Sequence, residues 1–132
     1  MKFSRNRKGF TLLELMIVLA IISILATMAQ PMFKTYVMRS KEAALKEDLF
    51  NLRNVLDQYY ADNGKYPDSL DDLVAKGYIR SIPSDPITGT NDWRPQYFTS
   101  DDSSSGETSG GICDVHSGSD KTGLDGRTYA EW

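Results

Sequence analysis

The feature that most constrains this chain is an apolar stretch near its start. Residues 15–33 contain no charged side chain and consist mainly of Leu, Ile, Val, Met and Ala. As an α-helix rising about 1.5 Å per residue, this stretch would be about 28 Å long, close to the roughly 30 Å hydrocarbon core of a bilayer. We therefore expect one helix that can span a membrane, and one small domain built from the rest of the 132 residues.

A single carboxylate, Glu14, lies just before this uncharged stretch. A charged side chain at the centre of a membrane costs about 2.5 to 3.5 kcal/mol, so such a residue usually has a function and a partner. In the first turn of a helix the cost is smaller, because the helix dipole favours a negative charge there. A secretory signal peptide is the alternative interpretation, but its apolar region is shorter and it has no use for a charge at this position.

Charge is distributed unevenly along the chain. Four of the 15 basic residues precede Gly9, namely Lys2, Arg5, Arg7 and Lys8. By the positive-inside rule this leader stays in the cytoplasm and the body of the protein is exported. Removal of residues 1–9, which include no acidic residue, would change the formal net charge from −3 to −7. The body is therefore acidic and gives no indication of nucleic-acid binding.

The junction between the leader and the apolar stretch reads Lys8-Gly9-Phe10-Thr11-Leu12-Leu13-Glu14. This motif resembles the processing site of type IV prepilins and of type II secretion pseudopilins. The resemblance implies that a membrane-embedded prepilin peptidase cleaves between Gly9 and Phe10 and methylates the new amine of Phe10. It also implies that Glu14, then the fifth residue, pairs with the terminal amine of a neighbouring subunit during assembly.

Beyond residue 33 the sequence predicts an amphipathic continuation of the helix. Its apolar residues recur at spacings of seven, four, three, four and three: Met38, Leu45, Leu49, Leu52, Leu56 and Tyr59. The charged residues between them, Glu42 and Arg53 included, are assigned to a solvent-exposed face. Gly64 favours a left-handed cap that ends this helix. Pro31 predicts either a kink or local melting, or the end of the membrane-spanning part.

The remaining residues predict a small body of mixed structure. Residues 69–76 predict a short capped helix closed by Gly77, and the prolines within residues 82–86 indicate a turn-rich connector. Residues 93–99 and 111–116 predict strands that flank a polar, serine-rich run. The expected fold class is α+β: a long N-terminal helix, membrane-spanning in its first half, packed on a small antiparallel sheet of two or three strands as in pilins.

Short motifs in the same order over most of the chain narrow the resemblance to the major pseudopilins, protein G, of type II secretion. They are Tyr60-x-Asp62-Asn63-Gly64-x-Tyr66-Pro67, Ile82-Pro83-x-Asp85-Pro86, Gly89, Tyr97 and Asp114-Val115-x-Ser117-x-Ser119-Asp120. Because protein G pseudopilins bind one calcium ion in the C-terminal loop, the resemblance implies calcium as a cofactor, with Asp120 and Asp125 as ligands. The residues alone favour a plain turn region rich in Asp and Gly.

No catalytic site is expected. Cys113 and His116 are separated by two residues on a predicted strand, so their side chains would point to opposite faces. A single cysteine cannot form an internal disulfide, and one cysteine with one histidine cannot build a zinc site. The tyrosines and Trp93 are interpreted as core and surface aromatics. The chain is therefore expected to be a structural protein and not an enzyme.

The motifs and the resemblance together predict a major pseudopilin, a structural subunit that polymerises into a helical pseudopilus driving protein secretion across the outer membrane. Its expected parts are a leader (1–9), a transmembrane and filament-core helix (10–33) and a periplasmic domain (34–132). The chain is expected to cross the inner membrane once. The resemblance implies four partners besides the membrane: further copies of the chain, minor pseudopilins, the prepilin peptidase and the inner-membrane assembly platform. The alternatives are a type IV pilus subunit for adhesion, motility or surface electron transfer, and a membrane-anchored periplasmic binding module that never assembles.

Overall fold

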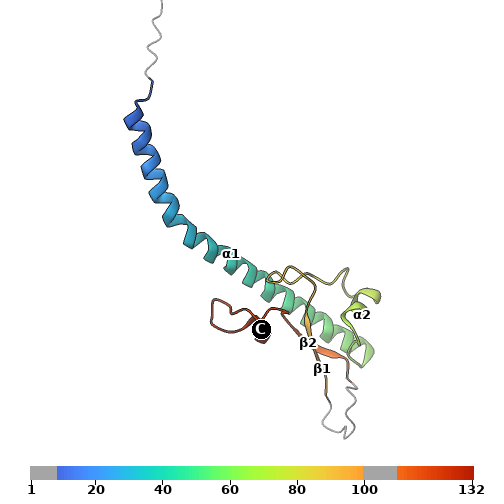
Figure 1. Cartoon of the computed structure of the whole chain (residues 1–132). Helices are drawn as coiled ribbons and strands as arrows, with labels where there is room; N and C mark the ends of the chain where they lie inside the picture. The colour runs from blue at the N-terminus through green and yellow to red at the C-terminus, as the bar shows by residue number, and fades with distance from the viewer. Residues whose placement is uncertain (1–8, 100–109) are drawn as a thin grey trace, which may run out of the picture. The chain divides into compact units, whose positions relative to one another are not determined.

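The computed structural model describes residues 9–99 and 110–132, so most of the polar run predicted between the strands lies outside the described residues. In chain order the elements are helix α1 (Leu12–Asn63), helix α2 (Leu70–Ala75), strands β1 (Arg94–Tyr97) and β2 (Ile112–His116), and the 3₁₀ helix η1 (Tyr129–Glu131) (Figure 1). The chain divides into two compact units, one ending at Val37 and one beginning at Met38. The predicted α+β fold class, with one long helix and a small antiparallel sheet, is confirmed.

Helix α1 has 52 residues, which confirms the prediction of one long helix. It continues through Pro31, so the proline does not end the helix. Because proline has no N–H, the helix lacks one internal hydrogen bond at this position. At the far end Gly64 takes a φ of 70°, and its N–H donates to the Tyr60 carbonyl oxygen at 2.8 Å. The predicted left-handed cap is therefore confirmed.

The first unit contains the membrane-length part of α1. In the described part of the chain, α1 is the one helix long and apolar enough to cross a membrane. Its large apolar side chains between residues 10 and 33 are all exposed to solvent in the isolated chain. A helix that is apolar on every side needs either a membrane or other protein around it. The first unit is thus built for one of these two environments.

The second unit folds around the predicted apolar stripe of α1. Leu45, Leu52 and Leu56 are fully buried, and Leu49 and Tyr59 are nearly so. The stripe packs against residues from the rest of the unit: Leu73, Trp93, Ile112, Val115, Tyr129 and Trp132. The amphipathic pattern was therefore interpreted correctly, and the partner surface it required is the sheet, α2 and the C-terminal residues.

Strands β1 and β2 pair antiparallel, with Arg94 opposite His116 and a register shift after Gln96. Both strands are shorter than predicted, since residues 93, 98, 99 and 111 lie outside them. Trp93 leaves the strand because its side chain turns into the core, where the indole N–H donates to the Pro83 carbonyl oxygen at 2.7 Å. The predicted strand positions are right; the end of β2 at His116 is also right, and the other three ends are wrong by one or two residues.

Helix α2 forms where the short capped helix was predicted. The Asp72 carboxylate accepts a hydrogen bond from the Ser69 N–H at 3.0 Å, which holds the start of the helix. Gly77 follows its end with a φ of 79°, a left-handed conformation that suits glycine. The prediction of a helix closed by Gly77 is confirmed.

The connector between α2 and β1 contains a buried carboxylate, Asp85, whose burial the sequence analysis did not predict. Its side chain is fully buried and accepts hydrogen bonds from the Ile87 N–H at 2.8 Å and the Gly118 N–H at 3.2 Å. The Ser117 hydroxyl donates to it as well. Three donors offset the cost of burying the charge. Asp85 therefore joins the connector to residues 117–132, which we call the C-terminal segment.

Candidate processing and assembly site

Gly9 and Phe10, the residues on either side of the predicted cleavage, lie before the first turn of α1. Neither has helical backbone, and the Phe10 side chain is 86% exposed. Proteolysis concentrates at exposed backbone that is not tied into secondary structure. The peptide bond between these two residues is therefore accessible in the way a processing site requires.

Thr11 caps the helix. Its hydroxyl oxygen accepts a hydrogen bond from the Glu14 N–H at 3.2 Å, and its carbonyl oxygen accepts one from the Leu15 N–H at 3.1 Å. A threonine hydroxyl in this position satisfies a backbone donor that has no partner inside the helix. Sequence reasoning missed this role, although a threonine three residues before a glutamate is the signal of such a cap.

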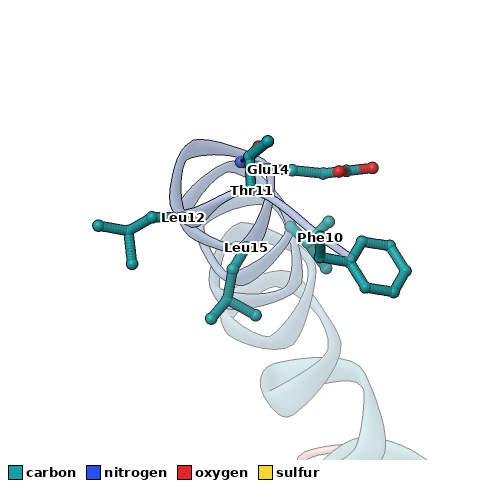
Figure 2. A pocket seen from close by; sticks show the side chains of 6 residues that line it. Phe10, Thr11, Leu12, Glu14 and Leu15 are labelled. Carbon is teal, nitrogen blue, oxygen red and sulfur yellow. Dashed lines mark hydrogen bonds between the residues drawn. The ribbon is translucent and has the colours of Figure 1, made fainter. Parts of the chain in front are cut away.

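Glu14 lies in the first turn of α1, where the positive end of the helix dipole favours a carboxylate. Its side chain is exposed. Figure 2 shows the Glu14 carboxylate and the Phe10 ring pointing to the same side of the helix. Within residues 9–99 and 110–132 no ion pair involves Glu14. A carboxylate in this position can form an ion pair with a positively charged group of another molecule.

The two residues predicted to bind calcium do not lie together as a metal site. Asp120 accepts a hydrogen bond from the Arg94 guanidinium at 2.9 Å, and Asp125 accepts one from Arg127 at 2.9 Å. The Arg94 guanidinium holds the pKa of Asp120 below its usual value, and hydrogen bonds from the backbone and side chain of Arg127 lower the pKa of Asp125. In the described ranges no group of three His, Cys, Asp or Glu could hold a metal ion. Each carboxylate is thus paired with an arginine, and calcium binding at these residues stays a prediction.

Glu42 corrects the assignment of charged residues on α1 to the solvent face, because only 8% of it is exposed. Its Oε1 accepts hydrogen bonds from the Leu124 N–H at 2.7 Å and the Tyr129 hydroxyl at 2.8 Å. Burial, and then the hydrogen bond to Glu42, raise the pKa of Tyr129 to about 12. The signal was present in the sequence, because Glu42 falls inside the gap of seven residues between Met38 and Leu45 and completes the stripe.

Arg53 also departs from the predicted solvent face. Its Nε donates to Asp114 Oδ1 at 2.6 Å, and its Nη2 donates to the carbonyl oxygens of Val115 at 3.1 Å and Trp132 at 2.9 Å. One guanidinium therefore joins α1 to β2 and to the C-terminal segment. Nothing in the local sequence pattern identifies these partners, because each lies more than 60 residues further along the chain.

Cys113 and His116 do not form a nucleophile and base pair in the described structure. Cys113 Sγ donates to the Gln96 carbonyl oxygen at 3.4 Å. His116 Nδ1 lies 2.6 Å from the Trp132 carbonyl oxygen, and its Nε2 lies 3.2 Å from Gln96 Oε1. Both side chains therefore have structural partners on the sheet and the C-terminal segment.

Comparison with known proteins agrees with the geometry at the N-terminus. The family model described as the prokaryotic N-terminal methylation motif matches residues 4–30. This range covers Gly9, Phe10 and Glu14 and most of the membrane-length helix. No solved structure gives a significant match.

Relatives among characterised proteins cover much more of the chain. The type II secretion system core protein G of Aeromonas hydrophila is 36% identical over 98 residues, which are 62% of this chain and 68% of that protein. The core protein G of Escherichia coli strain K12 is 36% identical over 106 residues, 65% of this chain and 70% of that protein. The fimbrial protein EcpC of Eikenella corrodens is 46% identical over a shorter region of 65 residues, 46% of this chain and 40% of that protein.

The agreement extends through the second unit, because alignments of about 100 residues cannot be accounted for by the N-terminal helix alone. The relatives are structural pseudopilins, which fits a chain whose cysteine and histidine have structural partners. The chain belongs to the family of the type II secretion system core protein G, the major pseudopilins.

Proposed function

We propose that this chain is the major subunit of a type II secretion pseudopilus. The leader ends at Gly9, the prepilin peptidase cleaves before Phe10 and methylates its amine, and the mature chain is held in the inner membrane with its body in the periplasm. The subunits then polymerise into a helical filament that drives secreted proteins through the outer membrane. Minor pseudopilins and the inner-membrane assembly platform are the further partners.

The observation that carries the proposal is the first turn of α1. An exposed scissile bond, a capped helix start and a carboxylate on the same side as Phe10 are all found within six residues, 9–14. In a filament the apolar surface of α1 would be buried against neighbouring helices. A carboxylate buried without a partner is costly, so Glu14 requires a cation such as the Phe10 amine of a neighbour.

Contacts between two different patches, repeated from subunit to subunit, generate open helical filaments rather than closed rings. Pairing of Glu14 on one subunit with the Phe10 amine of another is a contact of this kind. It also sets the axial position of each new subunit, because only one register brings the two charges together.

The test is Glu14→Ala in cells that carry the secretion machinery, with Gln30→Ala, an exposed polar residue of the same helix, as the control. We expect both variants to enter the membrane, as fractionation would report, and both to begin with a methylated Phe10, as mass spectrometry would report. Only Glu14→Ala should fail to form filaments in electron micrographs. If the Glu14→Ala variant formed normal filaments, the proposed pairing of Glu14 with the Phe10 amine would be wrong.

A type IV pilus subunit is the second candidate, and the similarity to the fimbrial protein of Eikenella corrodens favours it. The two functions predict different locations for the filament, the cell surface for a pilus and the periplasm for a pseudopilus. Shearing should release surface pili into the medium, whereas a periplasmic pseudopilus should stay with the cells, and its loss should stop secretion of an exported enzyme. A chain that is cleaved and folded but never crosslinks to other copies would instead support the membrane-anchored binding module.

A further inference from the structure

The C-terminal segment is attached to α1 by polar contacts at two places. The first is Glu42, a buried residue whose Oε1 accepts hydrogen bonds from the Leu124 N–H at 2.7 Å and from the Tyr129 hydroxyl at 2.8 Å. Gly123 lies against the same oxygen, since a Cβ at that position would be 3.1 Å from it. The loop before η1 is therefore held directly on the helix surface.

The second attachment is Arg53, whose Nη2 donates to the Trp132 carbonyl oxygen at 2.9 Å while its Nε binds Asp114. At about 100° per residue, Glu42 and Arg53 lie about three turns apart on one face of α1. The buried leucines of the stripe, Leu45, Leu49 and Leu52, lie between them. The polar contacts of Glu42 and Arg53 thus lie at the two ends of this row of buried leucines.

The residues predicted to bind calcium contribute little to this attachment. Asp120 pairs with Arg94 at the surface, where the Asp120 side chain is 81% exposed, and Asp125 pairs with Arg127, two residues away. Exposed ion pairs of this kind add at most a small stabilisation. Neither ion pair includes a residue of α1, so neither joins the C-terminal segment directly to the helix.

We propose that Glu42 and Arg53 form a polar clip that takes the structural role expected of a calcium ion, so that the body folds without a divalent cation. A cross-link between distant parts of the chain stabilises a small domain that has no disulfide. The clip provides it from side chains of α1 alone. This inference concerns the folding of the body and holds whether or not the chain polymerises. Calcium binding at Asp120 and Asp125 is the competing prediction, and one experiment decides between the two.

The experiment is thermal unfolding of the full chain in detergent micelles, followed by tryptophan fluorescence. Both tryptophans, Trp93 and Trp132, lie in the core of the second unit and therefore report on the body rather than on the membrane helix. The wild-type protein is measured in excess calcium chloride and in excess chelator. We expect the same melting temperature in both, and a chelator-induced fall of several degrees would overturn the proposal.

The variants test the clip itself. Glu42→Ala should lower the melting temperature by about 5 to 10 °C, because it removes the acceptor of two buried donors. Glu42→Gln should stay close to the wild type, because both donors bind Oε1 and an amide oxygen can take its place. Glu47→Ala, an exposed glutamate on the same helix, is the matched control. Equal melting of the Glu42→Ala and Glu47→Ala variants would contradict the clip.

Amide hydrogen exchange keeps the proposal testable even if Glu42→Ala does not fold. In the wild-type protein the Leu124 N–H should exchange as slowly as the amides of α1, because its acceptor is a buried carboxylate. Fast exchange at Leu124 would overturn the proposal. If the wild-type chain formed no filaments although its body folded and resisted the chelator, the proposed function alone would be contradicted.

Discussion

Arg53 offers a quantitative test of how the body is held together. Its side chain makes three hydrogen bonds to Asp114, Val115 and Trp132. A hydrogen bond to a charged group contributes about 1.5 to 3 kcal/mol when it is shielded from water. The side chains of Arg53 and Asp114 are 38% and 33% exposed, so solvent screens part of this energy. For Arg53→Ala we therefore expect a loss of roughly 2 to 3 kcal/mol in the free energy of unfolding.

For a body of this size, that loss corresponds to a fall in melting temperature of about 10 to 15 °C. The fall is measured on the full chain by tryptophan fluorescence, with Arg39→Ala as control because Arg39 is exposed on the same helix. Arg53→Lys should give an intermediate value, since an ammonium group keeps the charge but cannot reach all three acceptors in the fixed geometry of a guanidinium. Equal melting temperatures of the Arg53→Ala and Arg39→Ala variants would refute the reasoning.

Two further predictions concern the same region. The pKa of Tyr129 is raised from 10.0 to about 12 by burial and by Glu42, so the stabilisation it provides is complete below pH 10 and is lost as the pH rises through 12. As the pH rises between these two values, the free energy of unfolding of Tyr129→Phe should fall less than that of the wild type. An equal fall in both proteins would show that the Tyr129 phenol titrates normally. Gly123→Ala should lower the melting temperature by a few degrees, because its Cβ would lie 3.0 Å from the Trp132 ring and 3.1 Å from Glu42; an unchanged melting temperature would contradict the close packing.

The parts of the fold that local sequence determines were predicted well. The long helix, the stripe from Leu45 to Tyr59 and the glycine caps at Gly64 and Gly77 each follow from spacing or from the backbone freedom of one residue. The processing motif is equally local, because Gly9, Phe10 and Glu14 are recognised within seven residues of sequence. Such features need no knowledge of what the chain packs against.

The features that sequence analysis missed depend on partners far along the chain. A charged residue on an amphipathic helix is ordinarily assigned to solvent, and Glu42 is buried because Leu124 and Tyr129 supply donors more than 80 residues away. Asp85 is buried for the same kind of reason, since residues 117 and 118 donate to it. Charge alone does not determine burial; the number of donors that the tertiary fold brings to the charge does.

The cap at Thr11 has a consequence for the mature chain. Once Gly9 is removed, the new amine of Phe10 would lie one residue before the cap, at the positive end of the α1 dipole. A positive charge is least stable at that end of a helix, and methylation of an amine does not remove its charge. The start of the mature chain would thus place a cation at the unfavourable end of the dipole, and within the chain Glu14 in the first turn is the anion that can offset it. In the proposed filament, Glu14 of a neighbouring subunit would bring a second carboxylate to this amine.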